Sequence, residues 1–309
     1  MSTSRIYGPL ISTASPGEHE RQLVDVFAMT AAAPTELSAP TSADLFGVPG
    51  PIRLQAFATP GVEAGAVLCR FAEPGAPIRE EHSRVHRDAL RVVDFYAPDF
   101  DEALAHAASA GFAMQAAEAS YETNEGGFRE AHRHGPDGVV TAFLHGDRDF
   151  FADFAEVRDL VLSEPVSISL PLSDAGPTVA WYRQVFGWGV VYEYDFVDAS
   201  FSALMGVGEE LRVRSVTIGP SRQQTYVNVV DYGVGAGLGG SLAGHGVAPR
   251  RGLLGLVVLA DDVEQIARAA LGAAGPIVEV DLPGFGSTRA LVVAAPFGAP
   301  HLVIERSGR

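Results

Sequence analysis

The sequence is internally duplicated. Residues 26–29 match residues 185–188 at an offset of 159 positions, and further segments along the chain repeat at nearly the same spacing. A period that is held along a whole chain is the signature of repeated structural units. We therefore predict two copies of one domain joined by a linker, with the first copy at 1–147, the linker at 148–165 and the second copy at 166–309.

Each copy carries the same order of predicted elements twice. Residues 99–110 place Leu104, Ala107 and Ala108 at helical spacing, and Gly111 follows as a C-terminal helix signal. Short strand-like runs flank this helix, with a turn at residues 135–138. A strand, a helix and further strands, repeated four times, predict the α+β class with mixed sheets built from four βαβββ modules.

Composition excludes several kinds of chemistry. The chain of 309 residues is 47% hydrophobic, which is enough for packed cores, and its net charge is −16. All 22 basic residues are arginine, so the chain has no lysine for a Schiff base, a pyridoxal phosphate anchor or a P-loop. The negative field disfavours nucleic-acid partners. Cys69 is the only cysteine, so no internal disulfide forms.

The sequence also gives expectations about location. No apolar run reaches the ~18 residues that a membrane-spanning helix needs, and the first residues lack the pattern of a secretory leader. We therefore expect a cytoplasmic protein without a membrane partner. The sequence is also compatible with a homodimer.

Two motifs resemble a known superfamily. Residues 181–188 resemble the first-helix signature, and residues 134–140 the final turn and strand, of the vicinal oxygen chelate (VOC) superfamily of glyoxalases, bleomycin-resistance proteins and extradiol dioxygenases. The resemblance implies two glyoxalase-like domains, in each of which two modules curl a curved mixed sheet around one site. It also implies a divalent metal held by the first and last strands of each module.

The implied metal positions lack ligands. Alignment on the helix signature places the first-strand positions at Gly8, Val92, Ser167 and Gly255. The last-strand positions fall near Leu68, Ala142, Asn228 and Leu302. A stable site needs several His, Asp, Glu or Cys ligands around one point, and only Ser167 and Asn228 are even marginal. We therefore predict no metal and no other cofactor.

Three residues of the first copy are candidate catalytic groups. Asp94 stands in an otherwise apolar strand, and Tyr96 shares its face. Asp94 is either a solvated or arginine-paired carboxylate, with Arg91 or the candidate ligand-binding residue Arg53, or an acid/base group. Glu130 and His132 alternate on one strand face, where they are either proton-transfer groups or part of a solvated surface.

The second copy supplies further candidates. Tyr194, between Tyr192 and Phe196, belongs to an aromatic face that either stacks on a planar ligand or packs in the core. Arg212 is either a carboxylate clamp or an exposed ion-paired residue. We expect a catalytic Tyr226 and a ligand-binding Asn228 to face the cup, and His301 either to reach a ligand or to lie exposed.

These observations favour a metal-independent enzyme that acts by acid/base chemistry on a hydrophobic small molecule. Isomerisation, cyclisation and elimination are the reactions considered, and the resemblance places such proteins in bacterial secondary metabolism and antibiotic biosynthesis. Two alternatives remain. One is a non-catalytic antibiotic-binding resistance protein, which predicts an aromatic cup without convergent titratable groups. The other is a divergent metal-dependent dioxygenase or lyase that uses Glu130 and His132 as metal ligands.

Overall fold

The computed structural model describes residues 3–124, 126–146, 154–235 and 238–306. Of the predicted linker, residues 148–153 lie outside the described part. The first copy contains two modules, separated by the short helix η1 (Glu81–Ser83). Its first module consists of β1 (Ser4–Ser12), α1 (Pro16–Asp25), β2 (Thr30–Ala31), β3 (Thr35–Leu37), α2 (Ala39–Phe46), β4 (Ile52–Ala58) and β5 (Gly65–Phe71). Its second module consists of β6 (Val92–Tyr96), α3 (Phe100–Ser109), β7 (Glu118–Thr123), β8 (Gly126–His134), η2 (Pro136–Gly138) and β9 (Val140–Gly146).

The second copy repeats this order. Its first module consists of β10 (Pro165–Pro171), α5 (Gly176–Phe186), β11 (Gly189–Val197), α6 (Ala199–Leu204), β12 (Arg212–Gly219) and β13 (Tyr226–Asp231). Its second module consists of β14 (Gly252–Ala260), α7 (Val263–Ala269), β15 (Val278–Leu282), β16 (Gly286–Ala294) and β17 (Pro300–Glu305). The predicted α+β class with four modules is confirmed.

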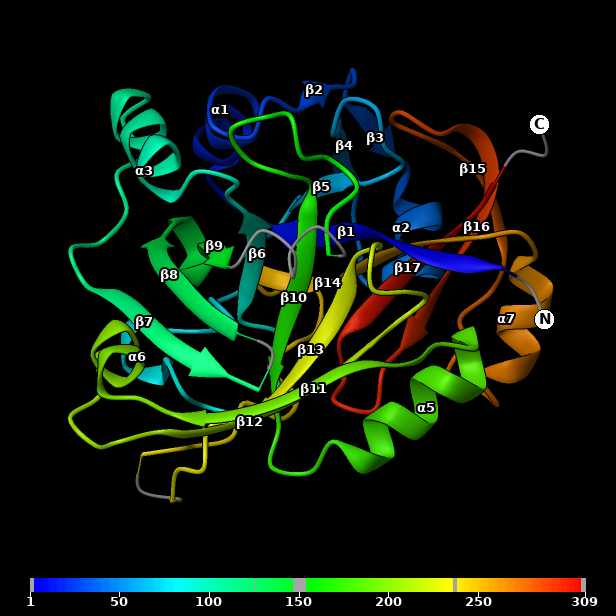
Figure 1. Cartoon of the computed structure of the whole chain (residues 1–309). Coiled ribbons are helices and arrows are strands. Elements are labelled where there is room, and N and C mark those ends of the chain that lie inside the picture. The colour runs from blue at the N-terminus through cyan, green and yellow to red at the C-terminus, as the bar shows by residue number, and fades with distance from the viewer. Residues whose placement is uncertain (1–2, 125, 147–153, 236–237, 307–309) are drawn as a thin grey trace.

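Each of the two sheets combines one module from each copy. The nine-stranded sheet has the order β15-β16-β17-β14-β1-β5-β4-β2, with β3 beside β4. The eight-stranded sheet has the order β11-β12-β13-β10-β6-β9-β8-β7. Figure 1 shows β6 beside β10 and β1 beside β14, the two strand pairs through which the copies are joined. We expected the two modules of one copy to share a sheet, and this pairing corrects that expectation, whereas the predicted linker boundaries stay a prediction.

The modules of one copy contact each other through helices instead. His106 on α3 lies within hydrogen-bond distance of the carbonyl of Val26, which follows α1. Gln184 on α5 donates to the carbonyl of Ala269 on α7. A large apolar cluster contains residues from both sheets and from these helices, including Phe27, Phe95 and Trp188. Strand pairing therefore joins the copies, and helix packing joins the modules within a copy.

Helix ends follow local sequence signals. The Asp99 carboxylate accepts a hydrogen bond from the backbone NH of Glu102, and Asp262 caps α7 in the same way through Gln265. Asp99 and Asp262 belong to the predicted repeat. The helices α2 and α6 were not anticipated. In the described part of the chain, α5 is the longest helix at 11 residues, and none is long and apolar enough to cross a membrane.

The two sheets differ on their inner faces. Apolar side chains that include Leu54, Cys69, Leu254 and Leu302 form one buried cluster on the nine-stranded sheet. At Gly255, a Cβ atom would lie 1.7 Å from the carbonyl oxygen of Pro300. The same close approach occurs at Gly8, against Gly65. Because backbone occupies the space of any side chain at these two positions, neither can carry a metal ligand.

We predict that Gly255→Ala lowers the free energy of unfolding by about 3 kcal/mol or more, because the added methyl group would push β14 away from β17. Chemical denaturation followed by circular dichroism measures this. Gly17→Ala is the matched control, since no atom lies within 4 Å of the added Cβ there and its stability should be unchanged or slightly higher. Equal stability of the two variants would contradict the close approach.

Candidate active site

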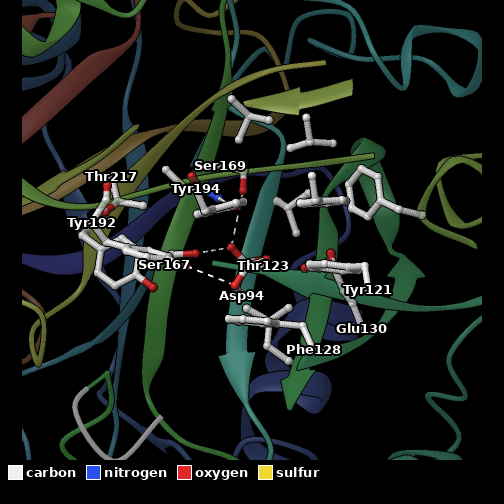
Figure 2. A pocket seen from close by; sticks show the side chains of 18 of the residues that line it. Asp94, Tyr121, Thr123, Phe128, Glu130, Ser167, Ser169, Tyr192, Tyr194 and Thr217 are labelled. Atoms are coloured by element: carbon white, nitrogen blue, oxygen red, sulfur yellow. Dashed lines mark hydrogen bonds between the residues drawn. The ribbon is translucent and has the colours of Figure 1, made fainter. Parts of the chain in front are cut away.

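The eight-stranded sheet encloses a cavity of about 60 Å³. Side chains from both copies line it, with Asp94 and Glu130 from the first copy and Ser167, Tyr194, Tyr226 and Asn228 from the second. Figure 2 shows Asp94 between Ser167 and Ser169, with Tyr121 and Glu130 on one side and Tyr192 and Tyr194 on the other. The site therefore exists only when the two copies pair.

Strand register positions Asp94. The antiparallel pair β6–β10 places Asp94 directly opposite Ser167, and Val92 opposite Ser169. A bulge at Val166 precedes this pair, and Tyr7 forms the equivalent bulge in β1, 159 residues earlier. The hydroxyls of Ser167 and Ser169 both donate to Oδ2 of Asp94, the latter at 3.4 Å. Asp94 is 4% exposed, so it is not a solvated rim carboxylate.

A second carboxylate lies across the cavity. Oε1 of Glu130 is 2.6 Å from Nε2 of His132, and Oε2 accepts a hydrogen bond of 2.8 Å from the hydroxyl of Tyr121. All three residues are buried. Burial alone would raise the pKa of Glu130, but the hydrogen bonds from His132 and Tyr121, together with the Arg91 charge, hold its pKa below the usual value. Burial lowers the pKa of His132, so that a neutral imidazole donates to an ionised Glu130.

The pKa values of the Asp94 and Glu130 carboxyl groups are shifted in opposite directions. Burial and then the negative charge of Glu130 raise the pKa of Asp94 to about 7, against smaller opposing effects of Ser167 and Arg91. A carboxyl group that titrates near neutral pH can both accept and release a proton under physiological conditions. Two acids with environments that separate their pKa values mark acid/base assignments in known active sites. Asp94 is therefore the carboxyl group of this cavity that can change its protonation state near neutral pH, whereas Glu130 stays ionised there.

Aromatic rings form most of the remaining wall. The rings of Tyr192 and Tyr194 stack at 5.2 Å, and those of Tyr194 and Phe196 at 6.1 Å. Phe196 stacks on Tyr121 at 4.1 Å, which continues the series to the opposite side of the cup. Phe154 lies edge-on to Tyr192. This aromatic belt offers apolar surface and ring faces to a flat ligand.

Polar groups of β12 and β13 orient this belt. Asn228 donates from Nδ2 to the hydroxyl of Tyr194 at 2.9 Å, and its Oδ1 accepts from Ser215. Tyr226 also lines the cavity, and burial raises its pKa well above the ordinary value. Its phenol therefore stays protonated and can donate a hydrogen bond, but does not act as a base at neutral pH.

The remaining predicted residues lie elsewhere. Tyr96 belongs to the buried cluster of Phe154, Tyr192 and Tyr226. Arg53 is exposed on β4 of the other sheet, and Arg212 is exposed because it alternates with the inward-facing Val213. His301 is fully buried in an aromatic cluster and pairs with the Tyr182 hydroxyl at 2.8 Å. Its side chain points to α5, so it reaches neither solvent nor this cavity.

The sequence did not reveal Tyr121 and Ser169 as contributors, and it indicated Arg91 only as a possible partner of Asp94. Among the described residues that line the cavity, Arg91 is the one with a positive charge. Residues 118–123 were not predicted as a strand, which hid Tyr121. Ser169 follows Ser167 at period two, and this alternation was a signal that both hydroxyls face the same side.

Comparisons with known proteins identify the fold. No family model and no curated protein matches the sequence. A variant of glyoxalase I from Zea mays aligns with a TM-score of 0.61 and 13% identity, over 98% of this chain and 93% of that one. A putative dioxygenase from Bacillus subtilis aligns with a TM-score of 0.58 and 10% identity, over 100% and 87%. The chain has a glyoxalase-like fold. At these identities the likeness concerns the fold alone.

The metal positions of a VOC fold do not fit a metal here. In the eight-stranded sheet these positions are occupied by Val92, Ser167, Ala142 and Asn228. The two modules place them equivalently: Ala142 pairs with the residue two after Val92, and Asn228 pairs with the residue two after Ser167. Valine and alanine offer no ligand, and Asn228 is already bound to Ser215 and Tyr194. Among the described residues, no three His, Cys, Asp or Glu side chains gather as a metal site requires.

We predict that Asp94 makes stability depend on pH in one direction. Because its folded pKa of about 7 exceeds the value of 3.8 of a free side chain, its contribution is present at low pH and is lost as pH rises through 7. Wild type should therefore lose up to about 4 kcal/mol relative to Asp94→Asn between pH 4 and pH 8. Urea denaturation of both proteins across this range measures the difference, and parallel curves would contradict it.

Proposed function

We propose that this protein is an enzyme that moves a proton on a flat, largely apolar small molecule, with Asp94 as the acid/base group and without a metal. One observation supports this above others: a buried carboxyl group with a pKa near 7 faces a cavity lined by aromatic rings. Isomerisation, cyclisation and elimination all begin with such a proton transfer.

The proposed step uses only side chains of the chain. The ionised Asp94 accepts a proton from a carbon or hydroxyl of the ligand, and the protonated Asp94 then returns it to another atom. Ser167 and Ser169 hold the carboxyl in place through both states, since a hydroxyl can donate or accept. The charge of Glu130 opposes ionisation of Asp94, and Arg91 opposes that effect, which keeps the two protonation states close in energy.

The shape of the cavity limits the ligand. A volume of about 60 Å³ leaves room for little more than water, because the tyrosine and phenylalanine side chains fill most of the cup. A ligand therefore enters by sliding between rings or by turning them outward. A thin aromatic or conjugated molecule fits this better than a bulky one, which agrees with a substrate from secondary metabolism.

The binding-protein alternative has support from the aromatic belt alone. A sequestering protein needs apolar surface but has no use for a carboxyl group poised near neutral pH. Because Asp94, Glu130 and Arg91 converge on the same cavity, the enzyme is the better account. The metal-dependent dioxygenase or lyase would use Glu130 and His132 as ligands. Nε2 of His132 and both carboxylate oxygens of Glu130 are already hydrogen-bonded, to each other and to Tyr121, and no third His, Cys, Asp or Glu joins them among the described residues.

Deuterium incorporation tests the proposal without knowledge of the natural product. Wild type incubated in heavy water with a panel of flat aromatic ketones and phenols should catalyse exchange into at least one of them, as measured by mass spectrometry. Asp94→Asn should reduce that exchange by a factor of 100 or more. Addition of a metal chelator should leave it unchanged.

Asp195→Asn is the matched control, since Asp195 is an exposed carboxylate on the outer face of β11 in the same sheet. Its exchange rate should equal that of wild type. Saturable binding of a panel member without exchange would favour the binding protein instead. Loss of exchange with the chelator, restored by a divalent metal, would favour the metal-dependent alternative.

A further inference from the structure

A second hollow shares Arg91 with the proton-transfer cavity, but the described residues that line it include none of the aromatic residues of that cavity. It has a volume of about 610 Å³ and is lined by residues of η1, β8, β9 and the segment after α3. Four arginines line it, Arg79, Arg84, Arg91 and Arg133, and we call it the arginine cleft. In a chain with a net charge of −16, such a concentration of guanidinium groups requires a physical explanation.

Two of the four arginines, Arg79 and Arg133, are explained by hydrogen bonds within the protein. Arg79 donates to the backbone carbonyls of Ser83, His86, Ala89 and Leu90, and so folds the connector between the first two modules. Arg133 donates to Glu18 at 2.8 Å and to Gln22, and its guanidinium lies over the ring of Phe112.

Arg91 is different. It is 2% exposed, and its Nε donates to the carbonyl of Arg84 at 2.6 Å. Its buried Nη2 has no hydrogen-bond acceptor among the residues that the structure describes. A buried cationic donor without a partner is unfavourable, and such a group in a native protein commonly indicates an ion or ligand.

Arg84 faces the same cleft and is only weakly engaged. Within the part of the chain that the structure describes, its ion pair is with Glu81 at 3.3 Å, and the Glu81 side chain is 89% exposed, so solvent screens the pair. Its guanidinium lies against Gly206 at the end of α6, where a Cβ atom would be 2.4 Å from Nη1. The absence of a side chain at Gly206 therefore makes the space for Arg84 beside the cleft.

The acids of the cleft do not neutralise these groups. Among the described residues that line it, Glu80 and Glu81 are the acidic ones, and both side chains are largely exposed. The apolar side chains of Ala113, Met114 and Val140 also line the cleft. Guanidinium groups together with carbon surface suit a small organic molecule that carries an oxyanion group.

We propose that the arginine cleft is a binding site for a small molecule with a carboxylate or phosphate group, which Arg91 and Arg84 hold. The site is distinct from the proton-transfer cavity, although Arg91 lines both. It goes beyond the proposed function and does not depend on it.

Isothermal titration with citrate and with inorganic phosphate, at constant ionic strength balanced by sodium chloride, tests the site. We expect saturable binding of at least one of them at one site per chain. Binding of citrate alone assigns a carboxylate, and binding of phosphate alone assigns a phosphate ligand. Arg84→Gln and Arg91→Gln should each weaken the affinity tenfold or more.

Arg212→Gln removes an exposed arginine elsewhere and should leave the affinity unchanged. Arg84→Gln keeps the test valid if Arg91→Gln fails to fold, because the Arg84 side chain is partly exposed at 26%. No saturable heat with either anion, or equal affinity in wild type and Arg84→Gln, would overturn the proposal. Since the titration involves no turnover, its failure would leave the role of Asp94 untouched.

Discussion

The antiparallel pairing of β6 with β10 is the contact on which the candidate site depends. It joins the two copies of the repeat and brings Asp94 opposite Ser167. The same pairing places Glu130 and Tyr121 of the first copy across from Tyr194 and Asn228 of the second. Neither copy alone contains this set, so the duplication produces a composite site whose two sides can diverge independently.

The inner faces of the two sheets differ in packing and polarity. The nine-stranded sheet has filled its inner face with leucine, valine and cysteine side chains, and glycines at 8 and 255 let its strands approach closely. The eight-stranded sheet has kept a cavity with buried polar groups, which cost stability unless they are hydrogen-bonded. Hydrogen bonds reach both carboxyl groups, from Ser167 and Ser169 to Asp94 and from His132 and Tyr121 to Glu130. Burial and the charge of Glu130 raise the pKa of Asp94, whereas the hydrogen bonds from His132 and Tyr121 hold the pKa of Glu130 below its usual value.

The repeat offset and the order of predicted elements were sufficient to predict four modules and the α3 helix, and the motifs at 134–140 and 181–188 predicted the glyoxalase-like fold. Sequence could not decide how the modules pair, because duplicated modules present equivalent strand edges and β1 has the same local pattern whether it joins β6 or β14. For the site, the alternation of side chains along a strand was informative, because it places Ser167 and Ser169 on one face of β10 and sets the face of β6 that carries Asp94. Arg53, Arg212 and His301 lie away from the cavity, since alternation alone does not say which face of a strand is inward.

The proposed chemistry depends on a buried carboxyl group, that of Asp94, that titrates near neutral pH. Carbon-13 NMR titration of the Asp94 side-chain carboxyl, assigned by comparison with Asp94→Asn, measures this directly. We predict a midpoint near pH 7 for that resonance. A midpoint near the ordinary value of about 3.9 would show that the carboxylate is stabilised in its charged form, and it would contradict a proton-transfer role at this position.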